Sequence, residues 1–215
     1  MIFRLAKICD LDKIASLQYK VRHLYTNGIF SSLDLFFLRN YYKTIINDPN
    51  SILVCGEDST DGVVGFCCAN LDVEKYNLNL KKNKFRLAFA ALPSILKKPT
   101  ILLKLISRFK TLNPKKNIYI TPKGARLEYW VWSKKNKDDQ SSIYMLESTL
   151  NIIKILGYNK VSFEVDLDNK KVLKFHKLNG ALELNRVLID DKTERVFMQY
   201  DFFNRKSKFN YVKKN

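Results

Sequence analysis

Two kinds of hydrophobic pattern follow one another along the chain. Short apolar runs rich in β-branched and aromatic residues predict strands at residues 2–6, 51–55, 63–71, 126–132, 160–165, 181–188 and 195–200. Apolar residues at helical spacing predict helices at residues 11–21, 35–46, 141–156 and 169–178. This order of elements is typical of an α/β domain with a mixed central sheet.

Local residue types indicate how these elements begin, end and connect. Asp10 is expected to cap the first helix, and Ser31 or Ser32 the second. The turn at residues 58–62 joins two strands into a hairpin, and residues 190–192 join the last two strands. The expected core positions of the third helix are Ile143, Leu146, Leu150, Ile153 and Ile155.

Residues 72–120 fit this order least well, and we treat them as an insertion. A polar stretch at residues 75–84 precedes two helical segments of mixed apolar and basic character, which Pro93 and Pro99 are expected to interrupt. Three roles are open for these segments. They are packing helices, a substrate lid or homodimer surface, or helices in contact with anionic lipid.

Chain length and composition indicate one domain, and the net charge of the chain is unusually high. The 215 residues are 46% hydrophobic, which is enough for a single core, so we expect one domain at residues 1–204 and a basic flexible tail at residues 205–215. The formal net charge is +17. Such a surface favours an anionic partner, which is a nucleic acid, an acidic membrane or a phosphorylated small molecule. The alternative explanation of the positive charge is compositional drift, in which an AT-rich genome enriches the sequence in lysine, asparagine and isoleucine.

Several features exclude classes of site. The cysteines, at positions 9, 55, 67 and 68, have no zinc-type spacing, so we expect no metal and a reducing compartment. No apolar run has the length of a spanning helix or a signal peptide, so a cytoplasmic location is expected.

One segment carries a resemblance to a known family. Residues 165–181, VDLDNKKVLKFHKLNGA, resemble the V-x-x-x-N-x-x-A-x-x-F-Y-x-x-x-G-F segment of the GNAT acyl-CoA N-acyltransferases, with histidine in place of tyrosine. The VVGF run at residues 63–66 resembles the family's third strand, and residues 4–17 resemble its opening. The resemblance covers the chain except roughly residues 72–120. It implies a GNAT-like fold, with helices on both faces of the sheet, and acetyl-CoA as cosubstrate.

The family's pyrophosphate-binding loop is degenerate in this chain. Its Q/R-x-x-G-x-G/A pattern aligns with Lys137, Gln140 and Ser142, and both glycines are missing. Glycine lets a backbone approach a phosphate closely, whereas a serine at a helix start caps the helix or donates its hydroxyl. The resemblance therefore implies cofactor binding by Lys137, Gln140, Ser141 and Ser142 through an altered loop, which Asp138 and Asp139 would oppose.

The resemblance also implies roles in amine acetylation. Glu128 corresponds to the base on the fourth strand, and strand alternation is expected to place it on the same face as Trp130 and Trp132. A backbone N–H near Val131 or Trp132 would stabilise the oxyanion. Glu128 is otherwise a surface carboxylate paired with Arg126.

Two further residues take roles from the resembling segment itself. His176 aligns with the tyrosine that protonates the departing thiolate, and Asn169 would contact the cofactor arm. The alternatives are a packed histidine and a helix-capping asparagine.

These observations predict an N-acetyltransferase. The acceptor would be a small amine. The basic–apolar insertion and residues 33–45, LDLFFLRNYYKTI, resemble bacterial family members of surface-polysaccharide synthesis, which implies a nucleotide-linked amino sugar, and such an acceptor would suit the basic balance. A non-catalytic GNAT-fold binding module is the first alternative, because the loop lacks its glycines. A basic nucleic-acid binder is the second, but no recognised motif supports it, so we expect no nucleic-acid partner.

Overall fold

The computed structural model describes residues 1–24, 29–111, 123–136, 138–189, 193–207 and 209. The described strands are β1 (Ile2–Leu5), β2 (Ser51–Asp58), β3 (Gly62–Asn70), β4 (Ala125–Trp132), β5 (Lys160–Asp166), β6 (Ala181–Ile189) and β7 (Thr193–Asp201). The described helices are α1 (Leu11–Val21), α2 (Leu35–Ile46), α3 (Val73–Lys82), α4 (Lys84–Lys97), α5 (Thr100–Thr111), α6 (Asp139–Ile155) and α7 (Lys170–Leu178).

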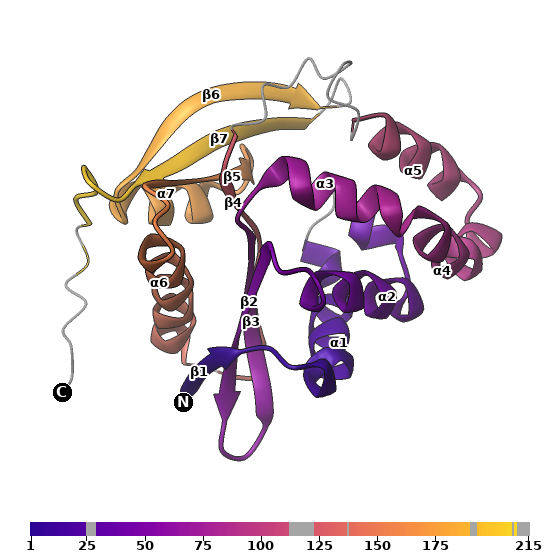
Figure 1. The fold of residues 1–215 in the computed structure, drawn as a ribbon, viewed down its shortest axis with the longest axis horizontal. Helices are drawn as coiled ribbons and strands as arrows, with labels where there is room; N and C mark the ends of the chain where they lie inside the picture. The colour runs from indigo at the N-terminus through magenta and orange to yellow at the C-terminus, as the bar shows by residue number, and fades with distance from the viewer. Residues whose placement is uncertain (25–28, 112–122, 137, 190–192, 208, 210–215) are drawn as a thin grey trace.

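All seven strands form one sheet in the order β1-β2-β3-β4-β5-β7-β6 (Figure 1). Every neighbouring pair is antiparallel except β4 and β5, which are parallel and are joined through α6. The β2–β3 hairpin and the mixed α/β class are therefore confirmed. The sequence did not show that β7 inserts between β5 and β6.

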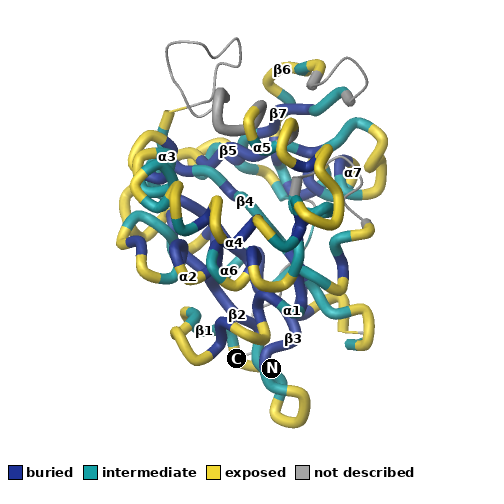
Figure 2. The backbone as a smooth tube through the Cα atoms, turned by 90° about the vertical axis from the view of Figure 1, so that its right-hand side faces the viewer, coloured by how far each residue is buried: buried dark blue, intermediate teal, exposed yellow. Residues whose placement is uncertain are grey.

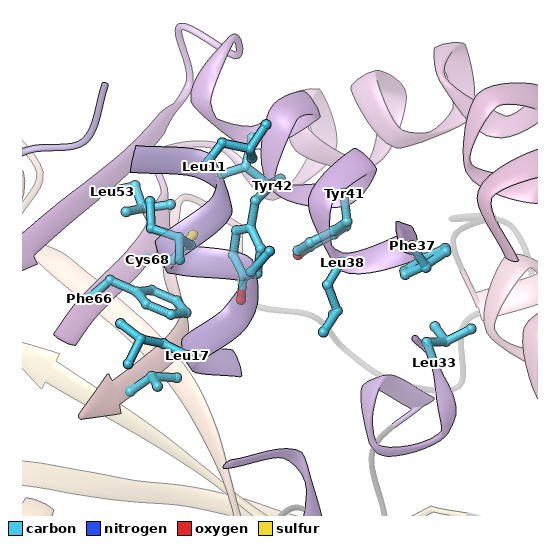
Figure 3. Close-up of a cluster of buried hydrophobic side chains, with 14 of the residues drawn as sticks. Leu11, Leu17, Leu33, Phe37, Leu38, Tyr41, Tyr42, Leu53, Phe66 and Cys68 are labelled. Atoms are coloured by element: carbon cyan, nitrogen blue, oxygen red, sulfur yellow. The ribbon is translucent and has the colours of Figure 1, made fainter. Parts of the chain in front are cut away.

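Helices cover both faces of the sheet. Helices α6 and α7 lie on one face, and α1 to α5 lie on the other (Figure 1). Both faces of β2 and β3 are buried, since their alternate side chains enter two separate clusters. Most of the backbone of these two strands is coloured as buried in Figure 2. The ring of Phe66 meets that of Tyr42 on the α2 side (Figure 3), and Cys67 points to the α6 side beside Met145.

The insertion consists of helices within its described part. The polar stretch expected at residues 75–84 is largely α3, whose N-cap Asp72 accepts hydrogen bonds from the amides of Glu74 and Lys75. Pro93 lies inside α4 without ending it, so the expected interruption there is wrong, whereas Pro99 does separate α4 from α5. Residues 112–120 of the insertion lie outside the described residues, as do residues 190–192.

One expectation about caps is partly right, and two about caps and core positions are wrong. Asp10 occupies the N-cap position of α1, but its carboxylate accepts hydrogen bonds from Arg4 and from the amide of Lys7 and none from α1. Asp34 caps α2 instead of a serine, because its Oδ1 accepts from the amide of Phe37 at 3.0 Å. Ile155 is 83% exposed at the end of α6, where the helix has turned past the sheet.

The first residues of the expected tail contact the domain. Arg205 forms an ion pair with Glu147 on α6, at 2.6 Å, and donates to the carbonyl of Asn179 at 2.8 Å. Its guanidinium also lies over the ring of Tyr200, 4.6 Å from the centroid. This part of the chain is therefore held against α6, the end of α7 and β7.

The side chain of Trp132 explains two glycines in the β2–β3 hairpin. A Cβ atom added to Gly65 would lie 2.1 Å from Trp132 Cε3, and one added to Gly56 would lie 3.0 Å from Cζ3. Atoms of the six-membered ring of the indole therefore lie directly against both strands, on the α6 side of the sheet. The GNAT-like "VVGF" glycine is here a packing requirement.

We expect Gly65→Ala to lower the free energy of unfolding by about 2 kcal/mol or more, because the new methyl group overpacks the strand against the indole ring. Urea denaturation followed by far-UV circular dichroism measures this change. Asp61→Ala, an exposed substitution in the same hairpin, serves as the control and should change stability by less than about 0.5 kcal/mol. Equal stability of the two variants would contradict the proposed contact.

Candidate functional site

The central feature of the site is an opening in the sheet between β4 and β5. These parallel strands pair only through Ala125 with Val161 and Arg126 with Ser162. Beyond these residues β4 continues to Trp132 along β3, and β5 continues to Asp166 along β7. The two strands therefore diverge toward their carboxyl ends, and the backbone edges that they turn toward each other there are not paired with one another.

A β-bulge at Glu128 lies where this divergence begins. The β3–β4 register shifts there, because Cys68 opposes Tyr129 whereas Ala69 opposes Leu127. Leu127 and Trp130 consequently pack on the α6 side, and Tyr129 packs on the α2 side. Strict alternation had predicted Glu128 on the face of the two tryptophans. The bulge makes that prediction wrong.

Glu128 instead belongs to a charged network. Its carboxylate accepts from Asn70 Nδ2 at 2.6 Å and lies 3.4 Å from the guanidinium of Arg126. The same guanidinium binds Glu164 across the opening at 2.8 Å. Arg126 thus holds a carboxylate from each of the two diverging strands. The expected pairing of Glu128 with Arg126 is present, but the Glu128 side chain is only 9% exposed, so it is not the surface carboxylate of that expectation.

The network continues outward on β5 and β7. Arg195 binds Glu164 at 3.0 Å and Asp166 at 2.7 Å. With Arg126 and Glu128 included, three carboxylates face two guanidinium groups, so the network carries one net negative charge. Such a local charge favours a cation, in contrast to the basic balance of the whole chain.

Two buried polar atoms of this network have no hydrogen-bond partner among the described residues. They are Oδ1 of Asn70 and Nε of Arg126. Asn70 is fully buried, and an unsatisfied buried acceptor costs about 1–3 kcal/mol. An N–H donor on a ligand would satisfy Asn70 Oδ1 beside the carboxylate of Glu128.

Tyrosines cover the Glu128 side of the network. The hydroxyls of Tyr41 and Tyr76 share a hydrogen bond of 2.6 Å. Burial raises the pKa of both phenols well above the usual value, and the nearby charge of Glu128 raises them further. Both groups therefore stay protonated at neutral pH and act as hydrogen-bonding groups.

Backbone directions distinguish Val131 from Trp132. The amide of Ser133 donates to the carbonyl of Val64 at 2.8 Å, so Ser133 faces β3. Because alternate residues of a strand face opposite edges, the amide of Val131 also faces β3 and that of Trp132 faces the β5 side. Of the two expected oxyanion donors, Trp132 is the one whose N–H is directed into the opening.

The start of α6 is capped by its own chain. The Asp138 carboxylate accepts from the Ser141 amide at 2.9 Å and from the Ser141 hydroxyl at 2.5 Å. The hydrogen bond from the Ser141 hydroxyl lowers the pKa of Asp138 most, and the bond from the amide lowers it further, so the group is ionised at neutral pH. A carboxylate therefore occupies the end of the helix dipole where an anion would otherwise bind.

The other expected cofactor-binding residues have different surroundings. Gln140 is exposed, and its amide donates to the hydroxyl of Tyr144 at 2.7 Å. Ser141 and Ser142 are both buried, and the carbonyl of Ser142 accepts from the indole of Trp130 at 3.2 Å. Lys137 lies outside the described residues.

His176 lies in the core under α7. The side chain is 5% exposed, contacts the rings of Phe163 and Trp130, and shares a hydrogen bond of 2.7 Å with Tyr200 through Nδ1. Burial lowers the pKa of His176 to about 3, and the charge of Arg205 adds to this effect. The imidazole is neutral at pH 7, which does not suit the expected role as a proton donor to a thiolate.

Asn169 caps a helix, which was the alternative to a contact with the cofactor arm. It is the N-cap of α7, and its Oδ1 accepts from the amide of Val172 at 3.4 Å. The side chain is exposed near the carboxyl end of β5, so a contact with a cofactor arm is sterically open.

Sequence reasoning missed most of the charged network. Asn70, Glu164, Asp166 and Arg195 come from three different strands, and no local motif connects them. A usable signal was present in part, since Glu164 and Asp166 alternate with the apolar residues of β5 and therefore share one face. No group of histidine, cysteine, aspartate and glutamate side chains in the described ranges is arranged to hold a metal ion.

Several solved structures of N-acetyltransferases are similar in fold to this chain. Aminoglycoside 6'-acetyltransferase type Ii matches with a TM-score of 0.57 and 14% identity, over 96% of this chain and 100% of that chain. Ribosomal-protein-alanine N-acetyltransferase from Brucella melitensis matches with a TM-score of 0.59 and 10% identity, over 94% and 99%. A point mutant of spermidine N-acetyltransferase SpeG from Vibrio cholerae matches with a TM-score of 0.57 and 11% identity, over 94% and 95%. No protein-family model and no curated protein sequence matches the chain.

The buried histidine predicts a pH dependence of stability. The unfolded chain takes up a proton on His176 near pH 6.5, whereas the folded protein does so only near pH 3. Between these values the unfolded state binds more protons, so stability falls as the pH falls. From pH 7 to pH 5 we expect a loss of about 2 kcal/mol that is absent in His176→Phe.

Urea denaturation of the wild type and variant at both pH values measures this difference. His23→Phe, which removes an exposed histidine, should keep the pH dependence of the wild type. An equal pH dependence in His176→Phe and the wild type would contradict the neutral buried state of His176.

The self-capped helix predicts the effect of one substitution on anion binding. Asp138→Asn keeps a side chain that caps well but removes the negative charge at the start of α6. We expect it to tighten coenzyme A binding by about threefold, measured by isothermal titration calorimetry. The control is Glu74→Gln, which removes an exposed carboxylate on α3, on the other face of the sheet, and should leave coenzyme A binding unchanged. Weaker binding by Asp138→Asn would show that the ligand does not approach this helix end.

Proposed function

We propose, for a chain that has the GNAT N-acetyltransferase fold, that it transfers an acetyl group from acetyl-CoA to the primary amine of a small acceptor. The single observation that carries this proposal is the divergence of β4 from β5 at the Glu128 bulge. It opens a slot through the sheet in which an extended thioester arm would lie along an unpaired strand edge. Acetyl-CoA would supply the acyl group, and no step requires a metal.

The acceptor would enter from the α2 and α3 side. The Glu128 carboxylate and the unsatisfied Oδ1 of Asn70 are both hydrogen-bond acceptors, as binding of an amine requires. The net negative charge of the network would attract the ammonium form from solution. We propose Glu128 as the group that then accepts the ammonium proton, because the amine attacks only when it is neutral.

The remaining steps follow from the slot. The amine nitrogen forms a bond to the thioester carbonyl carbon, and the Trp132 amide would donate to the oxygen as its charge develops. The carbon–sulfur bond then breaks with its electron pair going to sulfur, and the second proton of the nitrogen would pass through water to the departing thiolate. We assign no protein side chain to protonation of the thiolate, since His176 is buried and neutral.

The acceptor class is proposed more narrowly as an amino sugar carried on a nucleotide. The supporting observation is the combination of a locally acidic network around Glu128 with a net charge of +17 over the whole chain. An acceptor with an amine at one end and phosphates at the other would satisfy both. Spermidine, which carries only positive charge, would match the network but not the rest of the surface.

The test is acetyl transfer measured by release of the coenzyme A thiol. Glucosamine, a nucleotide-linked amino sugar, spermidine and an alanine-terminated peptide would be offered with acetyl-CoA. We expect Glu128→Gln to lower kcat about a hundredfold, because the amide cannot accept the ammonium proton. Glu74→Gln, an exposed substitution on α3, is the matched control and should leave the rate unchanged. Release of thiol by Glu128→Gln at the wild-type rate would exclude Glu128 as the base.

A second candidate is a GNAT-fold module without catalytic activity. The specific observation that favours it is the Asp138 carboxylate at the start of α6, where a pyrophosphate would otherwise be bound. Absence of coenzyme A binding by both the wild type and Asp138→Asn at millimolar ligand would support this module and contradict acetyl transfer.

A further inference from the structure

Helix α4 is apolar on two opposite sides. Its inner side is buried through Leu87, Ala90, Ala91 and Ser94, which pack over α2. Its outer side carries four large hydrophobic residues spaced i, i+4, i+7 and i+11, which share one side of a helix with 3.6 residues per turn. They are Phe85, Phe89, Leu92 and Leu96, with exposed fractions of 78%, 65%, 46% and 81%.

We call these four residues the α4 stripe. A packing helix needs only one apolar side, and soluble proteins rarely expose a continuous row of this kind. Helix α5, which packs against α4, adds Leu102, Leu103 and Ile106 to the exposed apolar surface of the insertion. The stripe therefore indicates a surface that binds a partner.

The charge around the stripe has one sign. Lys84 and Lys97 bound α4, Lys98 follows, and all three side chains are exposed. Lys84 Nζ lies 4.9 Å from the centroid of the Phe85 ring. From Lys75 to Leu127 the sequence has 14 lysine and arginine residues and no aspartate or glutamate. None of the ion pairs found within the described ranges involves the three exposed lysines.

We propose that the α4 stripe docks on the surface of an anionic lipid bilayer. Phenylalanine and leucine side chains would enter the boundary between headgroups and acyl chains, while the flanking lysines contact lipid phosphates. The contact would be peripheral, since none of the helices in the described ranges is long and apolar enough to cross a membrane.

Other occupants fit the stripe less well. A second copy of the chain joined through the same stripe would bring its lysines against those of its partner, and like charges repel. A nucleic acid would match the lysines, but it offers no apolar medium for two phenylalanines and two leucines. A lipid surface matches both the charge and the apolar side chains.

The experiment is co-sedimentation of the full chain with vesicles at physiological ionic strength. One set contains equal parts of phosphatidylglycerol and phosphatidylcholine, and the other contains phosphatidylcholine alone. We expect partitioning onto the anionic set only, weakened at least about tenfold by the double variant Phe85→Ser/Phe89→Ser. The variant Lys97→Gln/Lys98→Gln should weaken it by about tenfold.

The matched control is the double variant Ile155→Ser/Phe203→Ser. These residues are 83% and 77% exposed, and Ile155 ends α6 on the opposite face of the sheet (Figure 1). The control should partition like the wild type, and circular dichroism checks that every variant is folded.

Three results would overturn the proposal. The first is no sedimentation of the wild type with anionic vesicles. The second is unchanged partitioning of Phe85→Ser/Phe89→Ser, which would leave charge alone as the cause. The third is a homodimer in light scattering that this variant dissociates without any vesicle binding, which would make a second copy the occupant. Acetyl transfer does not enter these measurements, so failure of one proposal leaves the other standing.

Discussion

The site depends on the way Arg126 holds two carboxylates at the point where two parallel strands separate. Glu128 on β4 and Glu164 on β5 would repel each other across the opening without a cation between them, and a buried carboxylate without a partner is costly. The guanidinium fixes the start of the divergence, and the bulge at Glu128 turns β4 away from β5. The slot, the acidic network and the direction of the Trp132 amide all follow from this arrangement.

The fold could be predicted from the sequence because its signals are local and repeated. The continuous apolar runs of β2 and β3, the alternation of apolar residues in β5 and the helical spacing in α1 and α6 indicated the order of elements. The helix caps were harder, since Asp34 lies only two or three residues from Ser32 and Ser31, the two expected caps, and all three are good capping residues. The position of β7 between β5 and β6 depends on pairing between distant segments, which a linear pattern does not show.

The site was less accessible to sequence reasoning, for two physical reasons. A bulge adds one residue to one strand, so it reverses the faces of everything before it, and a period-two argument placed Glu128 among the tryptophans. Burial was the other reason. His176 matches a motif position, but its burial on the inner side of α7 and the nearby charge of Arg205 set its protonation, and neither can be inferred from the neighbouring letters. The ionised Asp138 cap likewise depends on a loop geometry that the missing glycines only hinted at.

The strand order also constrains when the sheet can be completed. Strand β5 pairs with β7 along its whole length, whereas its pairing with β4 is limited to two residues. During synthesis β6 emerges before β7. Because β6 pairs with β7 and not with β5, the backbone of β6 can form its sheet hydrogen bonds only after residues 193–201 have been made. The half of the sheet beyond the slot therefore closes after the other half. The nascent chain carries an unpaired β5 edge for that interval, which is the stage at which it is most open to intermolecular strand pairing.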